Sequence, residues 1–210
     1  MIITTVYMVL VAILVATPIG ILASVYLQEY AKQGKVVRVI RFATECLAGI
    51  PSIVYGLFGG IFFVVALKLQ YSILSGGLTV AIIILPTIIR STEEALKTVP
   101  STYREASLGL GATKFQTLYK VILPSAIPGI LSGVILSIGR VIGESAAILL
   151  TAGTVAKMPL TVFDSARTLT VHAYLLTKET GDIQTACGVG LVLIVIVFAL
   201  NTIAKLVAKK

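Results

Sequence analysis

The sequence predicts an all-α integral membrane protein with one domain over residues 1–210. Hydrophobic residues make up 57% of the chain and charged residues only 12%, whereas ordinary soluble domains carry about 25% charged residues. Long uncharged runs recur along the chain, and a helix of roughly 20 apolar residues crosses the hydrocarbon core. We therefore expect five spans, near residues 3–28, 50–68, 72–97, 125–150 and 184–205.

The net charge of +8 reflects membrane topology rather than a nucleic-acid-binding surface. Basic residues gather after the first expected span, around the end of the third and at the end of the chain. If the chain starts outside, five crossings place all three groups on one side of the membrane. The positive-inside rule makes that side cytoplasmic. We therefore expect a multi-pass protein in a lipid bilayer, with no nucleic acid among its partners.

Prolines and glycines mark the first three spans. Pro18 and Pro86 fall near the middle of the first and third spans, where proline is tolerated if neighbours satisfy the freed carbonyl group. They predict either a packing kink or a bend that shapes a pathway. Residues 36–47 are amphipathic and basic, which indicates a helix that lies along the interface or dips into it before the second span. In that span, Gly56 and Gly60 are four residues apart and predict a close helix contact.

Residues 153–183 form the longest polar segment on the expected outer side. His172 lies there and is expected to be structural or solvated rather than catalytic. Cys46 and Cys187 lie at or in apolar segments, so we expect free buried thiols and neither a disulfide framework nor a metal site. Apolar side chains predict that part of this segment folds back or packs against the spans: Leu169, Val171, Tyr174, Leu175 and Leu176.

A polar, glycine-hinged segment at residues 101–124, called the knob here, lies on the cytoplasmic side between the third and fourth spans. It predicts two short helices joined by a glycine turn, because it contains two capping boxes and an apolar face at helical spacing. The residues concerned are Thr102 with Glu105, Gly109 and Gly111, Thr113 with Gln116, and then Phe115, Leu118 and Ile122.

Three interpretations of the knob are open. It is a well-capped polar loop in which Glu105 is only a cap, or a helix-turn-helix DNA reader, which its short tether between two spans disfavours. The third is a docking element that transmits motion from a soluble partner to the spans. Small residues favour the third interpretation because they permit close approach: Ala106, Ser107, Gly109 and Gly111.

Two charged residues, Arg140 and Glu144, interrupt the fourth span. They are four residues apart and are expected to share a helix face. Arg140 lies roughly 20 Å along the helix from Ser125, where a charge costs at least about 2.5–3.5 kcal/mol. The pair either aids helix packing or forms a substrate pathway. In the second interpretation, Arg140 offers paired hydrogen bonds to an anion, and Glu144 holds Arg140 in the resting state.

The knob resembles the EAA loop of ABC importer permeases. That pattern is Glu-Ala-Ala, three residues, Gly, nine residues, Ile, one residue and Leu-Pro, and here Ser107 replaces the second alanine and Val121 the isoleucine. The resemblance implies that the knob is a coupling helix seated in a groove of an ATP-binding-cassette subunit. Its implied coupling residues are Glu105, Ala106, Ser107, Gly111, Leu123 and Pro124.

Residues 41–59, 85–90 and 139–147 resemble PstA-type permeases of phosphate ABC importers. The resemblance implies a MetI-like, type I importer fold in a bacterial or archaeal cytoplasmic (inner) membrane. It also implies a substrate pathway for phosphate at Arg140 and Glu144. Since that family ordinarily has six spans, its first span is expected to be missing here. The implied partners are a homologous PstC-type permease, a PstB-type ATPase dimer and an extracytoplasmic PstS-type phosphate-binding protein.

The chain has no Walker-type phosphate loop, so we expect no ATP hydrolysis and no enzyme activity in this subunit. ATP and magnesium are expected on the partner ATPase, with no cofactor in this chain. The alternatives are a permease for sulfate or molybdate, a secondary transporter or channel that works alone, and a membrane anchor without transport activity.

Overall fold

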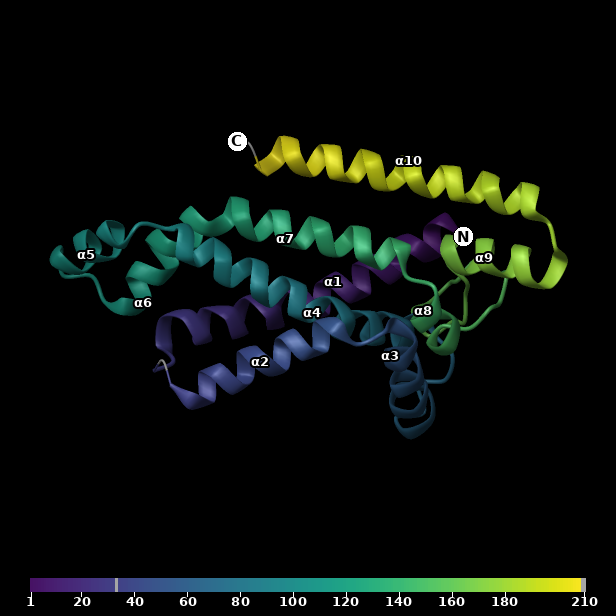
Figure 1. Cartoon of the computed structure of the whole chain (residues 1–210), viewed down its shortest axis with the longest axis horizontal. Helices are drawn as coiled ribbons and strands as arrows, with labels where there is room; N and C mark the ends of the chain where they lie inside the picture. The colour runs from purple at the N-terminus through teal and green to yellow at the C-terminus, as the bar shows by residue number, and fades with distance from the viewer. Residues whose placement is uncertain (33, 209–210) are drawn as a thin grey trace.

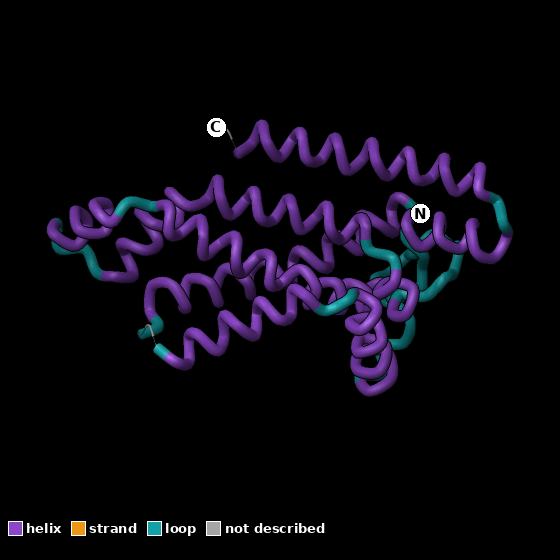
Figure 2. Tube along the Cα trace, viewed as in Figure 1, coloured by secondary structure: helices purple, strands orange, loops and turns teal. Residues whose placement is uncertain are grey.

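The chain folds into a bundle of helices, as the sequence predicts. The computed structural model describes residues 1–32 and 34–208, and every regular element within these ranges is helical. Figures 1 and 2 show long helices that run side by side, with short loops between most of them. The four long helices are α1 (Ile2–Val25), α4 (Ile73–Thr98), α7 (Leu123–Gly143) and α10 (Ile183–Ala208).

Within the described ranges, four helical segments are long and apolar enough to cross a membrane. They are Ile2–Tyr30, Ile73–Thr98, Lys114–Gly143 and Ile183–Ile203. The first continues from α1 into a π-helical turn, η1 (Tyr26–Tyr30). Pro18 and Pro86 lie inside α1 and α4, as expected from the sequence.

The predicted second span at residues 50–68 corresponds to a shorter helical segment, Ser52–Ala66, which is not long enough to be a crossing by itself. The chain instead forms a bent pair, in which α2 (Lys35–Gly49) meets a second helical segment at 99°. That segment is α3 (Ser52–Gly59) followed by η2 (Gly60–Ala66), and its residues extend only about 22 Å at 1.5 Å each. A core about 30 Å thick needs more, so a crossing here requires both members. The bend falls at Ile50, which is extended because a proline follows it.

The predicted fourth span at residues 125–150 extends beyond the helix that the structure forms there. Helix α7 ends at Gly143, Glu144 is extended at φ −76° and ψ 133°, and α8 (Ala146–Thr151) begins a separate helix. The Glu144 carboxylate accepts hydrogen bonds from the backbone amides of Ser145 at 3.1 Å and Ala147 at 3.3 Å. These contacts satisfy amide groups that a helix start leaves free, and they stabilise the break.

Close helix contacts hold α4 at the centre of the bundle. A Cβ atom at Gly20 of α1 would lie 2.6 Å from Ile88 Cγ2, and one at Gly129 of α7 would lie 2.6 Å from Ala95 Cβ. These glycines therefore let α1 and α7 approach α4 closely. The predicted small-residue face is used within this chain, because a Cβ at Gly56 would lie 2.8 Å from Ala147 Cα of α8.

The outer segment folds back on the bundle, as predicted. It forms α9 (Leu169–Leu175) and η4 (Leu176–Thr180), and the Leu169 amide donates to Thr5 Oγ1 of α1 at 3.1 Å. Leu169, Val171 and Leu175 are buried, whereas Tyr174 is exposed. The expectation of buried thiols is wrong, because Cys46 and Cys187 are both exposed. An apolar stretch in a membrane protein includes positions that face lipid or another chain, so it does not imply burial within one chain.

Candidate functional site

The knob forms two short helices joined at a glycine, as predicted. They are α5 (Ser101–Gly109) and α6 (Lys114–Thr117), and η3 (Leu118–Ile122) leads from α6 into α7. Gly111 has φ +84°, a left-handed conformation that glycine adopts without a steric cost. Figure 1 shows α5 and α6 projecting from one end of the bundle.

One of the two predicted capping boxes is present. The Gln116 amide donates to Thr113 Oγ1 at 3.2 Å, and the Thr113 amide donates to Gln116 Oε1 at 2.9 Å. The predicted box at Thr102 is wrong because α5 already begins at Ser101, after Pro100 at the N-cap position. Proline fixes the backbone angle before a helix start, so the helix begins two residues earlier than the Thr102 pattern indicates.

The EAA-like residues divide between the surface and the interior of the knob. Glu105, Ala106 and Gly111 are exposed, while Ser107 is half-buried with its hydroxyl 2.9 Å from that of Thr117. Large apolar side chains also lie exposed on the knob: Tyr103, Leu108, Leu110, Phe115 and Tyr119. An exposed apolar surface on a polar element is typical of a protein-binding site.

The base of the knob is anchored to the bundle. Leu118 and Ile122 are buried in a cluster with Leu96 of α4, but Phe115, predicted on the same face, is 67% exposed. It stacks instead on Tyr119, with ring centroids 6.4 Å apart. Leu118 and Ile122 therefore anchor the knob, whereas Phe115 remains at the surface.

Arg104 is an anchoring residue that sequence reasoning missed. Its Nη2 lies 2.7 Å from Glu29 Oε1 in η1, and its guanidinium also donates to the carbonyl oxygens of Val99 and Leu96. The sequence shows Arg104 only as one of several cytoplasmic basic residues. No local pattern identifies a partner that lies 75 positions earlier in the chain.

Arg140 and Glu144 do not share a helix face, which corrects the prediction. Arg140 lies in the last turn of α7, whereas Glu144 follows the end of that helix and caps α8. Gly129 and Gly133 of α7 face Ala95 and Ser91 of α4, and Val141 belongs to the same buried cluster as Ile84, near the middle of α4. Arg140 is therefore at mid-bundle depth, but its side chain is exposed at the surface of this chain. Among the ion pairs of the described residues, none includes Arg140.

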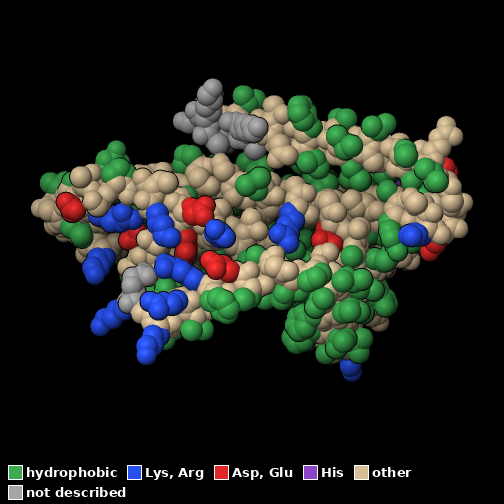
Figure 3. All heavy atoms as spheres, viewed as in Figure 1, with side chains coloured by type: hydrophobic (Ala, Val, Ile, Leu, Met, Phe, Trp, Pro, Cys, Tyr) green, Lys and Arg blue, Asp and Glu red, His purple; other side chains and the backbone are tan. Residues whose placement is uncertain are grey.

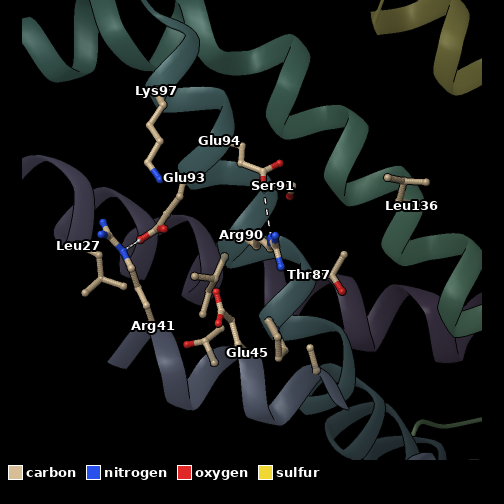
Figure 4. Close-up of a pocket in the computed structure, with 14 residues that line it drawn as sticks. Leu27, Arg41, Glu45, Thr87, Arg90, Ser91, Glu93, Glu94, Lys97 and Leu136 are labelled. Atoms are coloured by element: carbon tan, nitrogen blue, oxygen red, sulfur yellow. Dashed lines mark hydrogen bonds and ion pairs between the residues drawn. The ribbon is translucent and has the colours of Figure 1, made fainter. Parts of the chain in front are cut away.

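A hollow of about 530 Å³ lies between α2 and α4 and was not predicted from the sequence. Figure 4 shows Arg41 reaching from α2 toward Glu93 of α4, at 3.4 Å, and Arg90 beside Glu94, at 3.3 Å. Leu136 of α7 also lines the hollow. Because Leu136 precedes Arg140 by four residues, Arg140 lies on the same face of α7 as this lining residue.

The charges of the molecule are gathered at one end. Figure 3 shows most of the visible Lys, Arg, Asp and Glu side chains toward the end that carries α2, α5 and α6. Hydrophobic side chains cover much of the remaining helical surface in this view. This distribution agrees with a cytoplasmic position for the knob, because basic residues favour that side of the membrane.

A bundle of apolar helices that carries an exposed two-helix knob is the architecture of an ABC importer permease. Among solved structures, an inward-facing MetNI methionine ABC transporter matches 98% of this chain and 92% of its own, with a TM-score of 0.81 and 21% identity. A bacterial alginate ABC transporter matches 97% of this chain and 75% of its own, with a TM-score of 0.73 and 13% identity. These likenesses confirm the predicted fold class.

The chain belongs to the family of binding-protein-dependent transport system inner membrane components, whose family model matches residues 16–210. It is 37% identical to the probable ABC transporter permease protein YqgI of Bacillus subtilis, over 95% of this chain and 73% of that protein. It is 39% identical to the phosphate transport system permease protein PstA of Mycobacterium leprae, over 91% of this chain. The match spans 64% of that relative's length. These relatives are transport subunits and not enzymes.

Proposed function

We propose that this chain is the membrane permease subunit of an ATP-driven phosphate importer in a bacterial or archaeal cytoplasmic membrane. The proposal of phosphate rests on PstA relatives at 36–41% identity. The observation that carries the site is Arg140, a guanidinium at mid-bundle depth on an exposed face of α7. An arginine within a membrane costs several kcal/mol at the helix centre, so it needs an anionic or polar partner.

Arg140 has the chemistry to bind a phosphate anion during passage. Its guanidinium stays charged and donates paired hydrogen bonds to the oxygens of a tetrahedral anion. Because the side chain lies at the surface of this chain, a homologous permease subunit packed against this face would complete the site. Glu144 is the second residue of the proposed pathway, and its carboxylate accepts hydrogen bonds from the amides of Ser145 and Ala147.

The knob is the proposed contact with a cytoplasmic ATPase dimer. Its exposed surface includes Glu105, Ala106 and Gly111, and its last part, η3, leads directly into α7. Closure of the ATPase would move α5 and thereby shift α7, the helix that carries Arg140. An extracytoplasmic phosphate-binding protein would deliver the anion to the outer side. ATP and magnesium would bind on the ATPase chains rather than on this one.

Uptake by the complete importer in proteoliposomes tests this function. We expect uptake of labelled phosphate to require ATP on the cytoplasmic side and the phosphate-binding protein on the other. Unlabelled phosphate should compete, whereas sulfate and molybdate should not. Equal competition by sulfate or molybdate would indicate a different oxyanion, and uptake without ATP would indicate a secondary transporter.

A further inference from the structure

The turn η1, which follows α1, joins two parts of the molecule that are distant in sequence. Glu29, in the π-helical turn η1, accepts from Arg104 of the knob at 2.7 Å. Its neighbour Gln28 accepts from Arg41 Nη2 of α2 at 3.5 Å. Arg41 in turn lies 3.4 Å from Glu93 of α4. A continuous line of polar contacts therefore runs from the knob through η1 to α2.

Burial and charge make these contacts more than mobile surface pairs. Glu93 is 7% exposed, and a buried carboxylate without a cationic partner is strongly destabilising. The Arg104 and Glu29 side chains are 25% and 17% exposed, and Arg104 is further fixed by the carbonyl oxygens of Leu96 and Val99. By contrast, the pair of Arg90 and Glu94 is exposed at 71% and 65%.

The turn η1 is built to differ from the helix before it. Its hydrogen bonds are wider than those of an α-helix, as the bond from the Ala31 amide to the Tyr26 carbonyl at 2.8 Å illustrates. Leu27 within it is buried and lines the hollow between α2 and α4. A separate cavity of about 180 Å³ lies beside Glu29 and Arg104.

We propose that η1 is a second transmission point, through which movement of the knob reaches the bent pair of α2 and α3 independently of α7. Arg104 and Glu29 are positioning residues in this proposal, and Gln28 and Arg41 pass the displacement to α2. Contiguous contacts of this kind carry coupling between distant sites when the elements that they join have two arrangements. The inference rests on the proposed function, because it requires an ATPase that moves the knob.

A spin label on α2 tests this inference in the complete importer. The native Cys46 lies exposed on α2 and carries the nitroxide, while Cys187→Ser removes the other thiol. In the wild-type background, adding ATP should change the spectrum of the label. Arg104→Gln and, separately, Glu29→Gln should abolish this change while the ATPase still co-purifies. Uptake per ATP hydrolysed should fall about fivefold or more, the lower end of typical coupling between sites.

Two comparisons separate the possible outcomes. The charge-swapped pair Glu29→Arg with Arg104→Glu should recover part of the ATP-dependent change. Arg38 is an exposed cation on the same helix, α2, and Arg38→Gln should leave the change intact. An ATP-dependent change that persists in both single variants would overturn the inference. If the unmodified importer neither binds the ATPase nor takes up phosphate with ATP, the proposed function itself fails.

Discussion

The hydroxyl oxygens of Ser107 and Thr117 lie 2.9 Å apart and join the two helices of the knob. Ser107 stands where the EAA pattern has alanine, so this chain has a hydrogen bond that the pattern does not supply. Thr117 is buried, which shields the bond from water. The departure from the pattern therefore stabilises the angle between α5 and α6 rather than altering the exposed surface.

Removing this hydrogen bond should loosen the knob. Ser107→Ala should destabilise the protein by about 0.5–1.5 kcal/mol, the net value of a typical hydrogen bond. A double-mutant cycle with Thr117→Val, read by thermal unfolding in detergent, isolates the pairwise energy. Thr117→Ser keeps the hydroxyl group and serves as the control. Additive effects of Ser107→Ala and Thr117→Val would contradict the role of this bond.

The two glycines of the knob should respond differently to alanine. Gly111 has φ +84°, and an L-residue in this left-handed conformation costs about 1–2 kcal/mol. Gly109 ends α5 without a positive φ, so alanine there should be neutral or stabilising. A Cβ atom meets no neighbour within 4 Å at either position, which removes steric clash as an explanation. Thermal unfolding compares the two variants, and equal effects would show that the turn does not require glycine.

Glu144 should act through its acceptor oxygen rather than its charge. Glu144→Gln keeps an oxygen that caps α8 and should leave the phosphate dependence of uptake close to wild type. Glu144→Ala loses the hydrogen bonds from the Ser145 and Ala147 amides and should cost about 1 kcal/mol of stability. Uptake measured over a range of phosphate concentrations, together with thermal unfolding, checks both variants. A large change in phosphate affinity with Glu144→Gln would instead indicate that the charge of Glu144 acts directly beside Arg140.

Protein stability should fall in mildly acidic solution because of His172. Burial lowers the pKa of His172, and the charge of Arg167 lowers that pKa further. The unfolded pKa is about 6.5, so the unfolded chain binds more protons between the two pKa values. The contribution of His172 to the free energy of unfolding is therefore complete above the unfolded pKa. It decreases as pH falls toward the folded pKa. Thermal unfolding at several pH values should show this loss.

The matched variant for this pH dependence is His172→Gln. It removes the titrating group and should flatten the profile over the same range of pH, whatever its effect on the unfolding temperature at neutral pH. The Nδ1 atom of His172 is buried without a hydrogen-bond partner among the described residues. An unchanged profile in His172→Gln would assign the pH dependence to other groups.

The sequence predicts the features that depend on local composition and spacing. Apolar runs identify the long helices, and the pattern from Glu105 to Pro124 identifies the knob. The bend at Ile50 has a local signal, the proline that follows it. The end of α7 has none, because it depends on contacts such as the hydrogen bond from the Ala147 amide to Glu144. A spacing of four residues implies a shared face only if the helix continues.

Contacts between distant residues are the other part that local patterns miss. Arg104 and Glu29 meet because α1, α4 and the knob pack together, and neither residue belongs to a periodic or capping pattern that identifies the other. The hollow between α2 and α4 has the same origin, since helices from three parts of the chain line it. Only the packed arrangement of helices identifies these sites.

Phosphate uptake by Arg140→Ala, in an importer whose assembly is checked in parallel, tests the central claim most directly. We predict that the variant complex assembles, binds its ATPase and hydrolyses ATP, but takes up no labelled phosphate. Arg140→Lys should recover only part of the uptake, because an ammonium keeps the charge without the paired hydrogen bonds. Wild-type uptake by Arg140→Ala would contradict the assignment of Arg140 to the substrate pathway.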